Sequence, residues 1–168
     1  MLLKGCQFLK QGGAEAIVLC ANTMHFIADR LQKAIELPVI HIATETAIEI
    51  QKREIKKVGL LGTKFTMELD FFKDKLTEKG IEVIIPKKDA DRDFIHTTIF
   101  EELGRGLVTD ATKKRYLEIA DQLILEGAEG IILGCTEIPL VIKPHDLSVP
   151  VFDTALIHSK AVVAFQLS

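Results

Sequence analysis

Six short aliphatic runs, separated by segments with helical periodicity, constrain the fold of this chain more than any other feature. The runs lie at residues 16–20, 39–42, 58–61, 82–85, 130–133 and 149–152. Near-continuous aliphatic strands that alternate with amphipathic helices are typical of a mainly parallel sheet with helices on both faces. We therefore predict an α/β protein with a three-layer α/β/α sandwich.

The helical segments have recognisable ends. Residues 89–109 are predicted to form a helix that ends near 104–106. The next helix places Tyr116, Ala120 and Leu123 on one apolar face, with Asp110 as its predicted N-cap and Gly127 as its stop. Small polar residues gather where strands give way to helices, which is where ligands bind in such folds.

Composition and charge narrow the class of partner. The 168 residues are 48% hydrophobic, which is enough for one compact domain or two small lobes. A net charge of −3 without a basic cluster predicts neither nucleic-acid nor membrane-surface binding, so we expect a small-molecule partner. The opening residues lack the pattern of a secretory signal, which predicts a cytoplasmic protein. Scattered cysteines and histidines predict neither disulfides nor a metal site.

An internal repeat divides the chain into two related halves. Residues 13–19 and 127–133 match in glycine, alanine, acidic and aliphatic positions, 114 residues apart. We predict two pseudo-symmetric lobes, the first formed by residues 1–45 plus 153–168 and the second by 46–152. A cysteine follows each repeat, Cys20 in the first and Cys135 in the second. A pseudo-twofold arrangement would bring the two thiols towards one cleft.

Two thiols on opposite sides of an α-carbon suit the inversion of an amino acid, which needs a base on one face and an acid on the other. A helix N-terminus lowers the pKa of a thiol, here by an expected one unit or less, roughly the size of the helix-dipole effect. The substrate carboxylate and amine would bind hydroxyl, amide and backbone N–H groups at the helix starts. The candidates are Asn22, Thr23, Thr63, Thr66 and Thr136.

Three motifs, in order along the chain, resemble the aspartate/glutamate racemase family. They are C-A-N-T-M-H at 20–25, G-L-L-G-T-K-F-T-M-E-L-D-F-F at 59–72 and G-A-E-G-I-I-L-G-C-T-E-I at 127–138. The resemblance implies two α/β lobes, usually a homodimer, and a dicarboxylic amino-acid substrate. It also implies cysteine acid/base chemistry without pyridoxal phosphate or another cofactor. Cys135 and Cys20 become the catalytic candidates, and Glu137 joins the substrate-binding ones.

The spacing of the repeat departs from this family pattern. Gly127 precedes Cys135 by eight residues, whereas Gly13 precedes Cys20 by seven. If the strands superpose without a bulge, Ala21 stands at the position of Cys135, and a one-residue shift turns a side chain to the other face. A bulge at the strand end could re-aim Cys20. The alternative is a single-cysteine isomerase or decarboxylase of the same superfamily.

The start of the chain is a second departure. Family members begin with a further strand and helix that carry a basic residue for the distal carboxylate, and this βα unit has no counterpart in the 168 residues. We therefore expect the first lobe to be incomplete, with an exposed sheet edge that either a longer chain or a partner subunit covers. Arg105 is the remaining candidate for the distal carboxylate. A non-catalytic homologue that binds small acids is the third reading.

Overall fold

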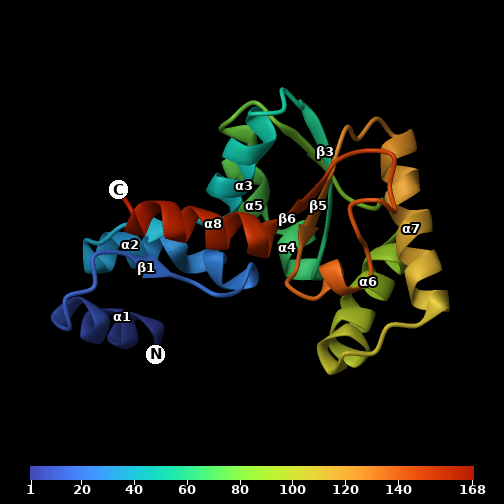
Figure 1. Cartoon of the computed structure of the whole chain (residues 1–168). Helices are drawn as coiled ribbons and strands as arrows, with labels where there is room; N and C mark the ends of the chain where they lie inside the picture. The colour runs from blue at the N-terminus through green and yellow to red at the C-terminus, as the bar shows by residue number, and fades with distance from the viewer.

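The computed structural model describes all residues, Met1–Ser168, as two parallel β-sheets surrounded by helices (Figure 1). The strands are β1 (Ile17–Val18), β2 (Val39–Ile40), β3 (Lys57–Gly62), β4 (Glu82–Ile84), β5 (Ile131–Gly134) and β6 (Val151–Asp153). The α-helices are α1 (Leu2–Gln11), α2 (Ala28–Ile35), α3 (Ile42–Gln51), α4 (Lys64–Glu68), α5 (Asp70–Thr77), α6 (Asp89–Glu101), α7 (Asp110–Leu125) and α8 (Thr154–Gln166). Three 3-10 helices complete the fold: η1 (Thr23–Ile27), η2 (Leu103–Arg105) and η3 (Ile138–Leu140). Each aliphatic run overlaps a strand, which confirms the predicted α/β class.

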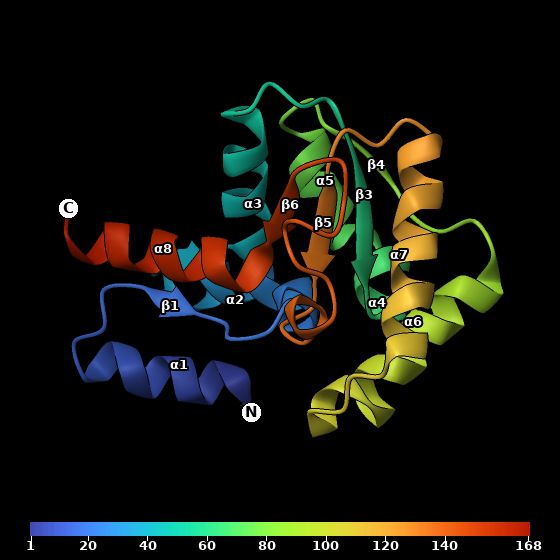
Figure 2. The same ribbon diagram turned by 45° about the vertical axis from the view of Figure 1, so that its right-hand side comes forward.

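The larger sheet has the order β4-β3-β5-β6, with all neighbours parallel. Helices α3 and α5 lie on one side of it and α6 and α7 on the other, so this lobe has three layers (Figure 2). Its core contains 27 buried residues, among them Leu60, Phe72 and Ile132. The apolar faces predicted from helical periodicity supply this core, because Tyr116 and Ala120 are fully buried.

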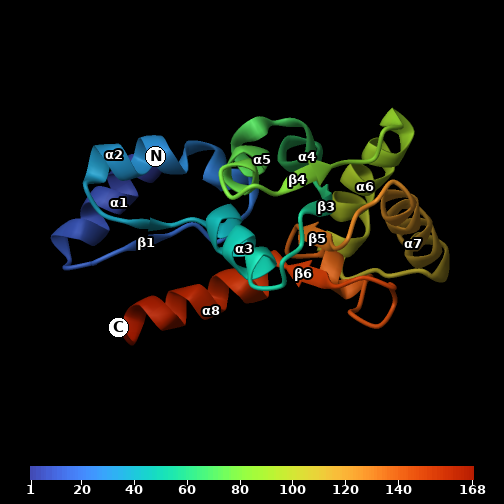
Figure 3. The same ribbon diagram turned by 90° about the horizontal axis from the view of Figure 1, so that it is seen from above.

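The smaller sheet consists of β1 and β2, with α1 and α2 packed against it. Its core contains seven buried residues, including Cys6 of α1 and Leu31 of α2. Seen from above, this lobe lies to one side of the larger sheet, and α8 packs on α3 and extends back beside β2 (Figure 3). The division at residues 45/46 and 152/153 stays a prediction; Ile42 and Ala43 of α3 belong to the larger core.

The two repeat glycines end their helices in the same way. Gly13 follows α1 with φ +90° and Gly127 follows α7 with φ +95°, a region that favours glycine. In both turns the N–H of the next residue donates to the carbonyl five positions back in the helix, Ala14 to Leu9 and Ala128 to Leu123, each at 3.0 Å. The predicted stop at Gly127 is therefore confirmed, and the repeat has a shared backbone conformation as well as a shared sequence.

The strand pairs that follow these glycines are also equivalent. Ile17 pairs with Val39 in the smaller sheet, and Ile131 pairs with Val151 in the larger one. Each of the first partners lies four residues after its repeat glycine. The two halves therefore align through these pairs without an inserted residue.

One predicted helix boundary needs correction. The N-cap of α7 is Thr109, whose hydroxyl accepts the backbone N–H of Thr112 at 3.0 Å. Asp110 is the first helical residue, where its charge still faces the positive end of the helix. Thr109 takes the cap because its backbone is extended. No helix of the chain combines the length and apolarity needed to span a membrane.

Candidate active site

All of the predicted site residues except Arg105 follow the carboxyl ends of β1, β3 and β5. Gly62 and Gly134 are paired at the ends of β3 and β5, so Thr63 and Cys135 emerge from neighbouring strands at one edge of the sheet. The strand ends pack closely: a Cβ on Gly134 would lie 2.9 Å from the carbonyl oxygen of Leu61. Only glycine fits there, and its absence of a side chain brings the two turns together.

Three threonine hydroxyls link the lobes. The Oγ1 atoms of Thr23 and Thr63 are 3.3 Å apart, and those of Thr63 and Thr66 are 3.2 Å apart. Thr63 is also the N-cap of α4, because its Oγ1 accepts the N–H of Thr66 at 3.3 Å. Thr63 and Thr66 are buried, while Thr23 is half-buried. The structure thus brings together hydroxyls that lie 40 residues apart in sequence.

Asn22, which precedes Thr23, is 4% exposed, and only the nitrogen of its carboxamide is hydrogen-bonded within the protein. Its Nδ2 donates to Oγ1 of Thr154 at 3.1 Å, and the Thr154 hydroxyl donates to the carbonyl of Leu133 at 2.8 Å. Its Oδ1 has no hydrogen-bond partner in the protein. Thr154 was not among the predicted residues, because nothing in its sequence neighbourhood marks it.

Cys135 is half-buried, and its Sγ donates to Oε2 of Glu137 at 2.8 Å. Burial, followed by the Glu137 carboxylate, raises the pKa of this thiol to about 12. The backbone N–H groups of Thr136 and Glu137 act in the opposite direction and do not prevail. The expected lowering of the thiol pKa is therefore wrong for Cys135, because desolvation and a nearby anion outweigh the helix start.

Cys20 has different surroundings. Burial alternates from buried Ile17 to exposed Val18, buried Leu19 and exposed Cys20, as on an extended strand. Cys20 and Ala21 both line a shallow hollow of about 370 Å³ that also includes Thr136. Cys20 therefore shares this hollow with Thr136, although Cys135 is not part of its lining, and whether Cys20 acts on a substrate stays a prediction.

Arg105 is not brought into contact with the other predicted residues. It lies in η2, its side chain is exposed, and its guanidinium donates to Glu101 at 2.9 Å, one helical turn back. The binding of a distal carboxylate by Arg105 stays a prediction, and it would require the release of this exposed ion pair, which costs little.

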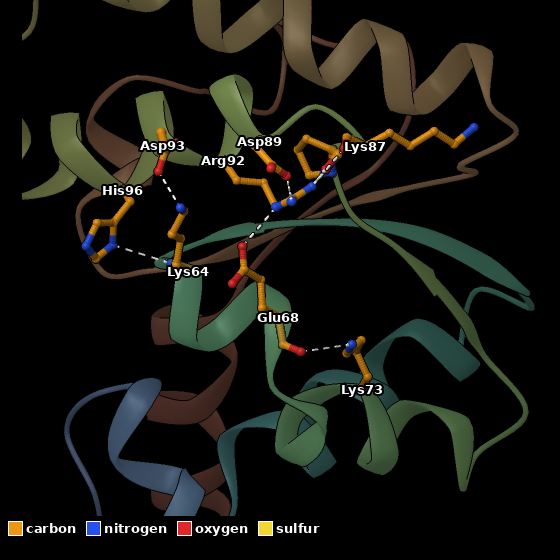
Figure 4. Close-up of polar contacts among 9 residues, drawn as sticks. Lys64, Glu68, Lys73, Lys87, Asp89, Arg92, Asp93 and His96 are labelled. Atoms are coloured by element: carbon orange, nitrogen blue, oxygen red, sulfur yellow. Dashed lines mark hydrogen bonds and ion pairs between the residues drawn. The ribbon is translucent and has the colours of Figure 1, made fainter.

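A polar network holds α4, the helix that begins after Thr63, against α6 (Figure 4). Arg92 of α6 donates through Nε to Oε1 of Glu68 at 2.9 Å. Nδ1 of His96 accepts the backbone N–H of Lys64 at 3.4 Å. The contact with His96 holds the start of α4, and the contact with Arg92 holds its last residue, so both ends of the helix that follows Thr63 are tied to α6.

Three buried histidines surround the turn after β1. The ring centroid of His25 lies 4.7 Å from that of His41 and 5.3 Å from that of His158. Nδ1 of His25 is 3.0 Å from the carbonyl oxygen of Ala21, the local role that its position just inside a helix predicts. Burial, followed by the charge of His25, lowers the pKa of His41 to about 4. No local sequence pattern marks this cluster, because its members come from three separate parts of the chain.

A second hollow, of about 630 Å³, lies between α3, α8 and the segment 139–144. None of the predicted site residues lines it. No group of three or more histidine, cysteine, aspartate or glutamate side chains is placed to hold a metal ion. The polar groups of the predicted site therefore gather at the strand ends and not in this hollow.

These features define a class: two-lobed parallel α/β proteins with a thiol, a carboxylate and several hydroxyls at the carboxyl ends of their strands. The chain belongs to the Asp/Glu/hydantoin racemase family, whose profile matches residues 1–162. It is 25% identical over 174 residues to the broad specificity amino-acid racemase RacX of Bacillus subtilis, covering 99% of this chain and 71% of that protein. It is 32% identical over 139 residues to the glutamate racemase of Aquifex pyrophilus, covering 81% of this chain and 51% of that protein.

A solved structure agrees with the fold throughout. The crystal structure of a putative Asp/Glu racemase from Yersinia pestis superposes with a TM-score of 0.94 at 46% identity, covering 99% of this chain and 73% of that one. The family resemblance drawn from the three motifs is thus confirmed. The chain spans about half the length of the Aquifex glutamate racemase, so activity and substrate are matters for proposal.

Proposed function

We propose that this chain carries the inversion chemistry of an aspartate- or glutamate-type amino-acid racemase that needs no pyridoxal phosphate. The observation that carries the proposal is the Cys135–Glu137 hydrogen bond of 2.8 Å, just after β5, whose neighbouring strand β3 ends directly before Thr63. A half-buried thiol paired with a carboxylate can move a proton, and the neighbouring hydroxyls can hold an acid. The relatives named racemases support the same reaction class.

The threonine hydroxyls would bind the α-carboxylate. Thr23, Thr63 and Thr66 form one chain of contacts across the lobes, and each hydroxyl can turn its proton towards an anion. Thr136 lies beside Cys135 and is exposed to an incoming ligand. Such binding would place the α-carbon within reach of Sγ, and positioning contributes more to such a reaction than any pKa shift.

Proton transfer would begin with Glu137. The thiol proton of Cys135 passes to the carboxylate, and the resulting thiolate takes the α-proton. The Cα–H bond breaks, an S–H bond forms, and the electron pair spreads into the substrate carboxylate. A proton delivered to the opposite face of the α-carbon completes the inversion. The high pKa of Cys135 makes its thiolate a strong base once it has formed.

The donor on the opposite face separates two versions of this proposal. In the first, exposed Cys20 supplies the proton. In the second, Cys135 is the only working thiol, and the chain acts as a single-cysteine isomerase or decarboxylase on a related acid. The second version is favoured by the strand pairs that align the repeat, because they put Ala21 at the position equivalent to Cys135.

The test is proton NMR of L- and D-aspartate and L- and D-glutamate in deuterated buffer, which follows loss of the α-hydrogen signal. Cys135→Ala should slow exchange at least about 100-fold, the usual contribution of a positioned acid or base. Cys6→Ala is the matched control, because Cys6 is buried in the smaller core away from the turns. It should cost stability and leave exchange within about twofold of the native rate.

Two further variants separate the versions. If Cys20→Ala also abolishes exchange, two thiols work; if it does not, and Ala21→Cys accelerates exchange, the single-thiol version holds. No exchange by the native chain with any of the four substrates would contradict the proposed inversion of aspartate or glutamate. It would leave the single-cysteine chemistry on another acid, or a homologue that binds small acids without turnover. A homodimer, as the family resemblance implies, and a cytoplasmic location are further proposals.

A further inference from the structure

Thr154 connects the two turns of the candidate site, although it belongs to neither. It is the first residue of α8, it is fully buried, and it contacts Asn22 from one lobe and Leu133 from the other. We infer that Thr154 is a positioning residue that holds the Asn22 carboxamide so that the site selects acids bearing an α-ammonium group. The inference rests on the proposed function and deepens it, because it names the feature of the substrate that is recognised.

The orientation of Asn22 follows from the hydrogen count at Thr154. A hydroxyl has one proton, and that of Thr154 is donated to the Leu133 carbonyl at 2.8 Å. The Thr154 oxygen can then only accept from Asn22, and only the Nδ2 end of the carboxamide carries protons. This pattern of donors and acceptors leaves Oδ1 as the free end of the carboxamide.

The free end of Asn22 is an acceptor in a place where water has little access. Asn22 is 96% buried and Oδ1 has no partner among the protein groups. A buried acceptor without a donor is costly, and a ligand that brings a donor removes that cost. An α-ammonium group brings up to three N–H donors, whereas succinate has none at the corresponding carbon. The carboxylate itself would be repelled by the lone pairs of Oδ1.

The two hydrogen bonds of Thr154, from Asn22 and to Leu133, also connect the two halves of the site. Asn22 is followed by Thr23 of the threonine chain, and Leu133 is followed by Gly134 and Cys135. Thr154 thus links the amine-binding group to the strand that carries the thiol. Loss of the hydroxyl would free the carboxamide to rotate and present Nδ2, a donor, where the ammonium should bind.

The test uses Thr154→Val, which removes the hydroxyl with little change of shape, and Thr154→Ser, which keeps it. Binding of L-aspartate and of succinate is measured by calorimetry for each variant. We expect Thr154→Val to weaken L-aspartate about tenfold and to leave succinate within about twofold, so that the preference for the amino acid collapses. Thr154→Ser should restore the native preference, which a merely structural role would not require.

The matched control is Thr46→Val. Thr46 is also fully buried, and its hydroxyl also donates to a backbone carbonyl, that of Ile42, at 2.8 Å. The same chemical change there should lower stability to a similar extent and leave the ratio of the two affinities unchanged. If both valine variants shift the ratio equally, the effect is a loss of stability and the inference fails.

A measurement on the protein without ligand checks the hydrogen bond from Asn22 to Thr154. The side-chain amide protons of Asn22 should exchange slowly with solvent in the native chain and at least about tenfold faster in Thr154→Val. Equal exchange in the two proteins would overturn the inference, as would an equal loss of L-aspartate and succinate binding. If the native chain binds neither aspartate nor glutamate, the proposed function fails and the inference fails with it. If the native chain binds L-aspartate and Thr154→Val binds it equally well, the inference alone fails.

Discussion

The two strand-to-helix turns of the repeat share a backbone plan and differ in chemistry. After β5, the close packing of the strand ends leaves room only for glycine at position 134, and Cys135 is half-buried against the carboxylate of Glu137. After β1, the equivalent positions hold Cys20, whose thiol is exposed, and Ala21, which has no reactive group. The same repeat has therefore produced one desolvated thiol and one that faces solvent.

Their neighbours explain the difference. Strand β5 lies between β3 and β6, so the turn that follows it is packed from both sides. Strand β1 pairs with β2 alone, and its following turn is enclosed on one side by buried histidines and open on the other. Backbone geometry set by a repeat does not by itself determine the electrostatics of a site; the elements packed around it do.

The largest expected difference between the turns is in thiol reactivity. At pH 8 the thiol of Cys135 should react with iodoacetamide about 1000-fold more slowly than that of Cys20, because its pKa is raised to about 12 and it is half-buried. Mass spectrometry of peptides after timed quenching measures both rates in one sample. Glu137→Gln should speed the reaction at Cys135 and leave Cys20 unchanged. Similar rates for the two thiols in the native chain would remove the contrast.

The second prediction concerns acid. The pKa of His41 is lowered to about 4 in the folded chain by burial and by His25, with Lys75 and His158 adding to the lowering and Asp29 opposing it. The unfolded chain, with a histidine pKa near 6.5, then binds more protons between these values. The stability that comes from burying neutral His41 is therefore complete above about pH 6.5 and is lost as the pH falls towards 4. The loss amounts to about 3 kcal/mol.

Urea unfolding at pH 7.5 and pH 4.5 measures this loss. His41→Asn should flatten the dependence, because asparagine can replace the ring as N-cap of α3 without titrating. The same substitution at exposed His145 is the control and should leave the dependence as it is. A native chain whose stability is equal at both pH values would contradict the burial of neutral histidines around the first turn.

The third prediction is a smaller loss of stability in the second turn. Gly134→Ala should lower the free energy of unfolding by about 2 kcal/mol, because the added Cβ would meet the Leu61 carbonyl at 2.9 Å. Gly5→Ala in α1 has open space around the new Cβ and should raise stability by about 0.5–1 kcal/mol. Urea unfolding of both variants decides the matter. An unchanged stability for Gly134→Ala would show that the turn after β5 is as open as that after β1.

Local pattern was sufficient for the secondary structure and for much of the site. Aliphatic runs predicted the six strands, and Thr63 and Thr66 could be assigned to a helix start because hydroxyls at such places cap free N–H groups. Thr154 could not be found in this way. Its role depends on contacts with residues 132 and 21 positions away, and only the packing of α8 across both lobes creates them.

The sequence by itself determined the α/β class, the succession of strands and helices along the chain and the phase of the repeat. These features depend on periodicity and on short-range backbone preference. Tertiary structure alone decided that Cys135 is a desolvated thiol, that three histidines lie together, and that Asn22 keeps a free oxygen. The reason is physical: pKa values and hydrogen-bond partners depend on which groups lie within a few ångströms. In this fold those groups come from strands and helices far apart in the chain.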